Sequence, residues 1–429
     1  MPRHKVKVIP QQGYYPSQIA VKILEYFDNE LDYDFKGKTV LLKPSFVLPV
    51  DDRDLTIAVD TNNALVAGVA KALSLKGAKK ILIAEHRTIG PARYAFYTRN
   101  IKKAVKGIKN VKMCYLDEKK REHVKIENPF IPEHVIKYPK LLLDDTVDYF
   151  ISLPKLKTNI FAGITLSVKN NFGLISKKER LKHHGLDLHG NLADLELIRQ
   201  PDLIITDAII SGEAQGPEQP TPYRSEMMVV SENCLACDTV CCYLMGQDPR
   251  GIEHLEMLHQ RGIGPLDLEE IDVENKDYLD SKKKEFIMPD SNLEMSDLMK
   301  SYVGTEKACQ GGCLGMIRGI LDTYGLVKGW YSLGRLNILL GDGLELTPEQ
   351  VIELKKSKKR NIIYGDCVKQ YKKLGSYFKG CPPDYTKSLL RIWLRGPLGI
   401  NPHLTLKYVS PFKYARAWML HILQRIFRF

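Results

Sequence analysis

The sequence lacks any long uninterrupted apolar segment. It contains no run of about 18 apolar residues, the length that a helix needs to cross a bilayer. The first residues, 1–9, alternate charged and apolar side chains and do not include the apolar stretch of a secretory signal. We therefore expect a cytoplasmic protein without a membrane-spanning helix.

Acidic residues are missing from the C-terminal part of the chain. The protein has a net charge of +12 over 429 residues, yet the segment 387–429 contains eight Lys and Arg residues and no Asp or Glu. The rest of the chain is only mildly basic, so no basic stripe covers the body of the protein. This distribution argues against a general nucleic-acid-binding surface, and we expect no nucleic acid among the partners.

A disulfide scaffold is not expected either, although the chain contains nine cysteines. Structural disulfides are typical of secreted proteins, and no secretory signal is visible. Cysteines in such a chain more often ligate metals or take part in thiol chemistry.

The length and the pattern of apolar runs predict at least two α/β domains. A chain of 429 residues exceeds what one hydrophobic core usually supports. Strand-like Thr39–Lys43, helical Asn62–Leu75 and strand-like Lys80–Glu85 form a βαβ unit, which implies a parallel sheet. Further strand-like runs occur at Tyr149–Leu153 and Leu203–Asp207.

We divide the chain into four parts. An N-terminal α/β domain with a parallel sheet covers 1–273, and a polar linker covers 274–295. A smaller α/β domain at 296–386 has strand-like runs at Asn337–Gly341 and Asn361–Gly365. A basic amphipathic tail covers 387–429.

Four cysteines of the smaller domain stand in loops rich in glycine and proline. Cys309 and Cys313 enclose two glycines, Cys367 follows a Gly-Asp pair, and Cys381 lies between a glycine and two prolines. Iron–sulfur clusters need about four converging thiolates, and glycine lets a loop backbone approach the inorganic sulfides closely. These cysteines therefore predict an iron–sulfur cluster. The alternatives are structural zinc, which four thiolates also suit, and four unrelated buried thiols.

The same strings resemble a known cluster motif. A glycine-bearing cysteine pair, then Gly-x-Cys, then Gly-Cys-Pro-Pro is similar to the proximal-cluster motif of the nickel–iron hydrogenase small subunit and its relative in respiratory complex I. The resemblance implies a 4Fe–4S cluster held by Cys309, Cys313, Cys367 and Cys381. Three residues separate Cys309 from Cys313, where the hydrogenase pair usually has two. We carry over the ligands and not hydrogenase activity.

A second cysteine group has helical spacing. Cys234, Cys237, Cys241 and Cys242 fall on one face of a helix, a pattern that favours a buried core. A second cluster or metal site is the alternative.

Lysine and histidine side chains gather after the strand-like runs of the N-terminal domain. The carboxyl ends of parallel strands open onto one crevice, where α/β proteins place their sites. Lysines there suit a carboxylate or phosphate, and a desolvated lysine can act as a base or nucleophile. We expect catalytic roles for Lys169, His183 and His184. We expect substrate-binding roles for Lys43, Lys155, Lys157, Asp207 and His189.

Longer strings resemble an uncharacterised family. From about Thr39 to Val273 the chain resembles domain-of-unknown-function family 362, often described as an uncharacterised iron–sulfur protein family. The strings include LLKPS (41–45), LPKLKTN (153–159), AGITLSVKNNFGL (162–174), PDLIITDAI (201–209) and CDTVCCYLMGQDP (237–249). This sequence departs from the family pattern at Ser45, where Asn is usual, and at Asn159, where His is common. The second departure removes the expectation of a metal ligand there.

A weaker similarity of spacing, from Asn159 through Gly163 to Lys169, is to the cofactor-attachment region of nickel-pincer lactate racemases. In those enzymes a lysine carries the pincer nucleotide, and Lys169 would match it. The histidine at 159 and the racemase's glycine-rich string are missing, so we do not expect racemase chemistry.

The end of the tail predicts an amphipathic helix over 411–429. Basic and polar side chains, including Lys413, Arg416 and His421, lie largely on one face, and apolar side chains lie mostly on the other. Such a helix suits the surface of an anionic membrane. Docking on the protein's own body or on a partner subunit is an equal alternative.

The leading interpretation is a cytoplasmic α/β protein with a redox cluster beside an anion-binding pocket. It would be an oxidoreductase or an electron-transfer component, with a small anionic substrate or a redox partner protein, and with peripheral membrane contact as an option for the tail. A non-catalytic cluster carrier or assembly factor is one alternative. A zinc-stabilised transferase or isomerase without redox chemistry is the other.

Overall fold

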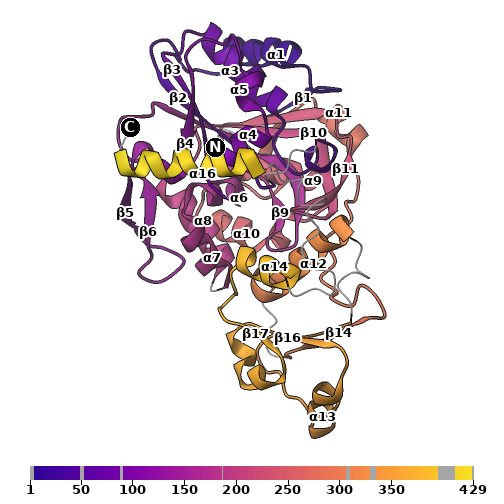
Figure 1. The fold of residues 1–429 in the computed structure, drawn as a ribbon. Helices are drawn as coiled ribbons and strands as arrows, with labels where there is room; N and C mark the ends of the chain where they lie inside the picture. Colours follow the sequence, from indigo (N-terminus) through magenta and orange to yellow (C-terminus); the bar gives the residue numbers. More distant parts are fainter. Residues whose placement is uncertain are drawn as a thin grey trace.

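A large mixed sheet forms the centre of the N-terminal region (Figure 1). The computed structural model describes residues 4–48, 53–86, 90–185, 187–305, 310–328, 335–394 and 411–427. Within these residues the sheet has eleven strands. The main path runs in the order β13 (Ile271–Glu274), β1 (His4–Pro10), β12 (Met227–Ser231), β10 (Leu203–Gln215), β7 (Tyr149–Leu153), β2 (Thr39–Pro44), β3 (Lys80–Glu85) and β4 (Val111–Tyr115).

The strands at the centre of this path are parallel. β10, β7, β2, β3 and β4 all run in one direction, whereas β12 is antiparallel to both β10 and β1. Three further strands lie off this path. β8 (Lys155–Asn159) and β11 (Gln219–Tyr223) pair with β10, and β9 (Gly163–Thr165) pairs with β8. The predicted α/β fold with a largely parallel sheet is confirmed.

Helices cover both faces of the sheet, as strands with apolar side chains on both faces require. In β2, Val40 and Leu42 belong to one hydrophobic cluster, and Leu41 belongs to the cluster on the opposite face. The first face carries α1 (Pro16–Asn29), α3 (Asn63–Leu75), α4 (Ala92–Thr98) and α5 (Ile101–Ala104). A short helix, α2 (Arg53–Thr56), lies in the connection between β2 and α3. The second carries α6 (Ser167–Asn170), α8 (Leu188–Ile198), α9 (Cys234–Leu244) and α10 (Glu253–Gln260). Helix α7 (Lys177–Gly185) contacts α8, and its Leu181 packs against the hydrophobic cluster of the second unit.

The four cysteines of helix α9 lie inside the second hydrophobic cluster. Cys234, Cys237, Cys241 and Cys242 are all buried, with at most 1% of their surface exposed. The expectation that these side chains pack in the core is confirmed. Burial also raises the pKa of Cys242 well above its usual value, which keeps this thiol protonated and unreactive.

A smaller parallel sheet follows. It consists of β14 (Met299–Val303), β15 (Leu336–Leu340), β16 (Arg360–Tyr364) and β17 (Ser376–Phe378), in that order. The helices of this unit are α12 (Gly315–Lys328), α13 (Pro348–Lys356) and α14 (Tyr385–Leu394). Helix α13 has Thr347 as its N-cap and Pro348 as its first residue.

Part of the predicted linker packs on the first sheet. Helix α11 (Lys276–Lys282) lies within 274–295, and its Leu279 is fully buried. Phe286 is also buried, in the same cluster as helix α9. The first half of this segment therefore belongs to the N-terminal unit.

A separate two-stranded hairpin pairs β5 (Arg121–Lys125) with β6 (Val135–Pro139).

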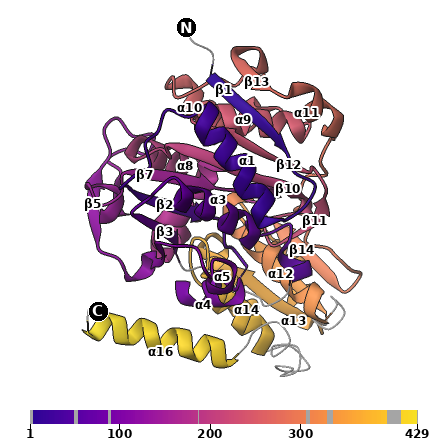
Figure 2. The ribbon, with the colours of Figure 1, turned by 90° about the horizontal axis from the view of Figure 1, so that it is seen from above.

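Residues 387–394 of the predicted tail belong to helix α14 of the second unit. The end of the tail forms helix α16 (Pro411–Phe427), which lies along the outside of the N-terminal unit (Figure 2). It packs on α4 and on the short helix η1 (Leu116–Glu118). No helix in the described ranges combines the length and the apolar character that crossing a membrane requires.

Candidate functional site

A buried ion pair marks the carboxyl ends of two central strands. Lys43 is the second-to-last residue of β2 and Glu85 ends β3, and their side chains meet at 2.8 Å with at most 3% of either exposed. Lys43 Nζ also donates to the Pro44 carbonyl and to Asn170 Oδ1, while Glu85 accepts from the Phe46 amide. Burial lowers the pKa of Lys43 and raises that of Glu85, and each opposing charge counteracts the shift of the other.

A glycine lets the chain pass close to this pair. A Cβ atom at Gly173 would lie 2.7 Å from Lys43 Nζ and 3.0 Å from Glu85 Oε1. Asn170 closes the same corner, because its side-chain amide donates to the Lys43 carbonyl and to Ser152 Oγ. The turn after α6 is thus built around the ion pair.

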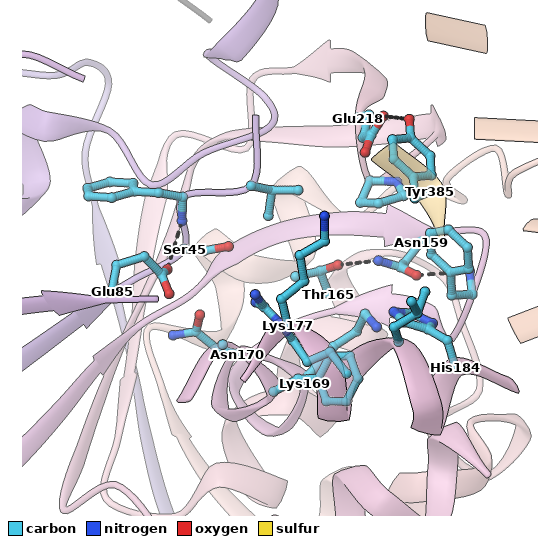
Figure 3. Close-up of a pocket in the computed structure, with 18 of the residues that line it drawn as sticks. Ser45, Glu85, Asn159, Thr165, Lys169, Asn170, Lys177, His184, Glu218 and Tyr385 are labelled. Carbon is cyan, nitrogen blue, oxygen red and sulfur yellow. Dashed lines mark hydrogen bonds between the residues drawn. The ribbon is translucent and has the colours of Figure 1, made fainter. Parts of the chain in front are cut away.

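The ion pair lines a cavity of about 210 Å³ between the two sheets. Figure 3 shows Glu85 and Asn170 at one end, Asn159, Glu218 and Tyr385 at the other, and Lys169 and Lys177 between them. The charged and polar lining comprises Lys43, Ser45, Glu85, Asn159, Thr165, Lys169, Asn170, Lys177, Arg180, His184, Glu218 and Tyr385. The apolar lining includes Phe46, Val47, Phe161, Phe172, Leu181 and Met316.

Lys169 is the basic group of this cavity whose charge is least compensated. Its pKa falls from the usual 10.5 to about 7, chiefly because of burial and secondly because Lys157 and Arg180 are also positive. Its Nζ lies 5.4 Å from the centre of the Phe172 ring. Within the described ranges no acidic side chain pairs with it. Lys169 can therefore exist in either protonation state near neutral pH.

Asp238 fixes the helix that carries Lys169. Its two carboxylate oxygens accept the backbone N–H groups of Ser167 and Val168, at 2.8 and 3.1 Å. These amides belong to the first turn of α6 and would otherwise lack partners. Burial raises the pKa of Asp238 to about 7, although these two bonds oppose the shift. Asp238 lies on the cysteine helix α9, so the core of the second face positions the site.

Asn159 organises a turn at the cavity wall. Its Nδ2 donates to Thr165 Oγ1 at 2.8 Å, and its Oδ1 accepts from the Phe161 and Ala162 amides. These bonds hold the hairpin between β8 and β9 in shape. Both polar atoms of this side chain are therefore engaged in the turn.

The second unit closes the cavity. The Tyr385 hydroxyl at the start of α14 donates to Glu218 Oε2 at 2.6 Å. Lys177 Nζ lies 3.9 Å from Asp384 Oδ2. Met316 of α12 adds an apolar side chain to the lining. Sequence reasoning missed Glu218, Tyr385 and Met316, because they come from a loop of the first domain and from two helices of the second.

Three of the predicted substrate-binding residues are buried outside this cavity. Lys155 and Asp207 are fully buried and pair at 3.3 Å, and the Tyr14 hydroxyl bridges them with two bonds of 2.8 Å. Lys157 donates to the carbonyls of Val59 and Pro217. Burial lowers the pKa of Lys157 to about 8. None of the three predicted residues lines the cavity, although Lys157 depresses the pKa of Lys169.

Of the three predicted histidines, one lines the cavity and two lie outside it. His184 lines the cavity between the Phe161 and Phe172 rings, at centroid distances of 4.8 and 5.2 Å. His183 is buried, and its Nε2 lies 3.4 Å from His134 Nε2. Burial and His134 lower the pKa of His183 to about 4.

His189 lies outside the lining as well. Its Nδ1 is 3.0 Å from His254 Nδ1, so one ring donates to the other. Burial lowers the pKa of His189. The cavity thus unites Lys43, Lys169 and His184 of the predicted site and leaves the others in the surrounding core.

The loops of the second unit that carry Cys313, Cys367 and Cys381 meet one another. Cys309 lies outside the described residues, and Cys313 is buried. A Cβ atom at Gly365 would lie 2.9 Å from Cys313 Sγ and 3.8 Å from the Gly380 carbonyl oxygen. The Asp366 amide donates to that carbonyl at 3.1 Å. The loops that carry Cys367 and Cys381 are therefore joined next to the Cys313 thiol.

Residues 40–243 match the family described as "Domain of unknown function (DUF362)". This match confirms the family resemblance of the sequence over these residues. The DUF362 segment includes the Lys43–Glu85 pair, Lys169 and His184, whereas Met316, Tyr385 and the cysteine loops lie beyond it.

Comparison with individual proteins gives more limited likenesses. The chain is 30% identical over 124 residues to a thylakoid-associated protein of Synechocystis, a match that covers 28% of this chain and only 39% of that relative. A Thermotoga maritima protein of known crystal structure has a TM-score of 0.36 at 13% identity, covering 59% of this chain and 60% of that one. The lactate racemase apoprotein of Thermoanaerobacterium thermosaccharolyticum has a TM-score of 0.33 at 11% identity, covering 68% and 88%.

Because no acidic side chain of the described ranges pairs with Lys169, we expect its amine to titrate near neutral pH. In protein labelled with ¹³C at lysine Cε, one resonance should titrate near pH 7, because burial and the neighbouring positive charges disfavour the ammonium form. That resonance should be missing from Lys169→Met and present in Lys182→Met, a variant of an exposed lysine on α7. Titration of every lysine near the ordinary value of about 10.4 would contradict the described environment.

Proposed function

We propose that the protein is a redox protein that holds a 4Fe–4S cluster on Cys309, Cys313, Cys367 and Cys381 beside a basic cavity for a small anion. It would act as an oxidoreductase or an electron-transfer component. The observation that carries the proposal is the junction of the cysteine loops with the elements that line the cavity. Cys313 lies three residues before Met316, and Cys381 lies four residues before Tyr385.

The residues around these thiols fit a cluster. Gly365 leaves space directly against the Cys313 sulfur, space that a Cβ atom would fill. Gly365 and Gly380 both have positive φ angles, which glycine adopts without strain. Cys367 and Cys381 are exposed and Cys313 is buried. Glycine-lined thiolates of this kind suit the inorganic sulfides of a cluster.

A bound cluster would supply one-electron transfer. The chain's own residues would bind the substrate and move protons. Lys169, Lys177 and Arg180 would hold an anion, and the protonated Lys169 could donate a proton to it. The neutral form of Lys169 could accept a proton, because its pKa of about 7 makes both states accessible.

The walls of the cavity favour a particular substrate class. The basic groups share the lining with Phe46, Phe161, Phe172, Leu181 and Met316. Apolar walls exclude water and strengthen the attraction between a bound anion and the buried lysine. A carboxylate attached to a compact apolar or aromatic body satisfies both parts of the lining.

The exposure of Cys367 and Cys381 favours a second function. Ligands that open to solvent suit a carrier that passes its cluster to another protein, with the cavity as a structural feature. Such a carrier would bind no small anion in the cavity, so ligand binding separates the two functions.

The cluster predicts the spectrum and metal content of anaerobically purified protein. We expect about four irons and four sulfides per chain with a broad absorbance near the blue end of the visible spectrum. Cys367→Ser should lose most of both, whereas Cys114→Ser, a buried thiol of the first sheet, should keep them. Zinc without sulfide in the purified protein would contradict the redox proposal.

A glycine substitution tests the same site without touching a ligand. Gly365→Ala should lower the iron content, because the new Cβ would displace the Cys313 sulfur. Gly37→Ala places a Cβ atom at another positive φ with no atom within 4 Å of it, so it controls for adding a methyl group to a glycine turn. Gly365, at φ 103° and ψ 159°, lies in a region that essentially only glycine adopts, so Gly365→Ala also strains the backbone that places Cys367. Equal iron content in both variants would show that close approach to Cys313 is irrelevant.

The cavity predicts binding of a small aromatic carboxylate, for which benzoate is a suitable probe. Calorimetry should show binding of benzoate but not of uncharged benzyl alcohol. Affinity should be highest below pH 7 and fall at higher pH, because the amine of Lys169 must then take up a proton to pair with the carboxylate. Lys169→Met should weaken binding roughly tenfold or more, and Lys182→Met should not. Binding that is unaffected by Lys169→Met would contradict this use of the cavity.

A further inference from the structure

Helix α16 is fixed on the protein by one defined face. Ala417 is fully buried, and the Tyr414 ring packs edge-on against Tyr94 at 5.1 Å. His421 is 2% exposed, and its Nδ1 lies 3.4 Å from Glu118 Oε1 and 3.7 Å from Asp117 Oδ2. Contacts three and four residues apart set the rotation of the helix about its axis.

The opposite face of the helix is apolar and open to solvent. The exposed fractions are 88% for Phe412, 54% for Met419, 49% for Ile422, 39% for Leu423 and 64% for Ile426. Their spacing of seven, ten, eleven and fourteen residues from the first places all of them on one stripe. Figure 2 shows the helix at the edge of the molecule, so its outer side meets no other described element.

This orientation differs from a common surface helix, in which the apolar stripe faces the core and the polar face meets water. Here the histidine, the tyrosine and a small alanine make the contacts with the body. The larger aliphatic side chains are directed outward. Burying this stripe requires something outside the chain's own described residues, and an exposed stripe of this kind marks an interaction surface.

The charge of the segment selects the partner. Residues 387–429 contain eight Lys and Arg residues and no acidic residue, and Arg416 is exposed beside the apolar stripe. Two copies of this helix placed face to face would bring their positive charges together. The surface of an anionic bilayer instead attracts basic side chains and accepts an apolar helix face.

We propose that helix α16 is a membrane-docking element that lays its outer apolar face into the interface of an anionic lipid bilayer. The helix would lie in the plane of the interface, with its stripe buried by about 5–10 Å. Its inner face would stay attached to α4 and η1, so docking orients the whole N-terminal unit against the lipid. The proposal is independent of the cluster and the cavity.

Vesicle flotation of the full-length protein tests this docking. The wild-type chain should float with vesicles that contain phosphatidylglycerol and remain largely unbound to vesicles of phosphatidylcholine alone. High salt should weaken the binding, because it screens the basic side chains. The double variant Ile422→Ser/Ile426→Ser should lower the partition coefficient by about tenfold or more, since it removes two aliphatic side chains from the buried stripe.

A matched control separates docking from general hydrophobicity. Ile352 lies on α13 and is 52% exposed, so Ile352→Ser should leave flotation unchanged. All three proteins should have the same circular dichroism and melting temperature, because both substitution sites face solvent.

Three results would overturn the proposal. One is the absence of wild-type binding to phosphatidylglycerol vesicles. Another is equal binding by the wild type and the Ile422→Ser/Ile426→Ser variant. The third is a lipid-independent dimer in light scattering that the double variant abolishes, which would assign the stripe to a second copy of the chain.

Discussion

The N-terminal unit buries several lysine side chains at the carboxyl ends of its parallel strands, and the arrangement of the site depends on how their charges are compensated. A buried ammonium group is costly unless a charge or several hydrogen bonds compensate it. Lys43 is paired with Glu85, and Lys155 is paired with Asp207. Lys157 relies on two backbone carbonyls. These three amino groups are satisfied within the protein.

Lys169 has no comparable compensation in the described ranges, and its pKa reflects that imbalance. The fold nevertheless holds the residue firmly, because Asp238 caps the turn that carries it. A rigidly held lysine that has no counter-charge is stabilised when an anion binds beside it. The proposed anionic ligand would thus supply the negative charge that Lys169 lacks in the described part of the protein. The second unit completes the cavity through Tyr385 and Met316, which follow Cys381 and Cys313 by four and three residues in the sequence.

The sequence predicts most of the fold because the buried strands are short apolar runs between glycine, proline and polar residues. β3 and β7 have the predicted bounds, and β2 extends one residue further. Placement of Lys43 and Glu85 at one sheet edge follows from the parallel order. The roles of Lys155 and Asp207 do not follow, because their partner Tyr14 lies 141 residues before Lys155. The local sequence pattern identifies charged side chains near the carboxyl edge of the sheet. Pairing with residues distant in the sequence determines which of these side chains can still bind a ligand.

The tail shows the same limit. Its helical period is evident in the sequence, and the helix begins at the predicted Pro411. The face of α16 that packs on the body is set by Asp117 and Glu118, some 300 residues earlier in the sequence. Their carboxylates lie next to the His421 ring. Apolar periodicity alone favours burial of the aliphatic stripe, whereas the structure turns that stripe outward.

We propose that the cavity lies next to a cluster held by the cysteines and that the two act together. Electron paramagnetic resonance of the chemically reduced protein, recorded with and without saturating benzoate, tests this coupling. We expect a cluster signal whose shape changes when benzoate binds to the wild-type protein, and a signal that does not respond in Lys169→Met. A cluster spectrum that stays identical while calorimetry shows the cavity of the wild-type protein to be full would contradict it.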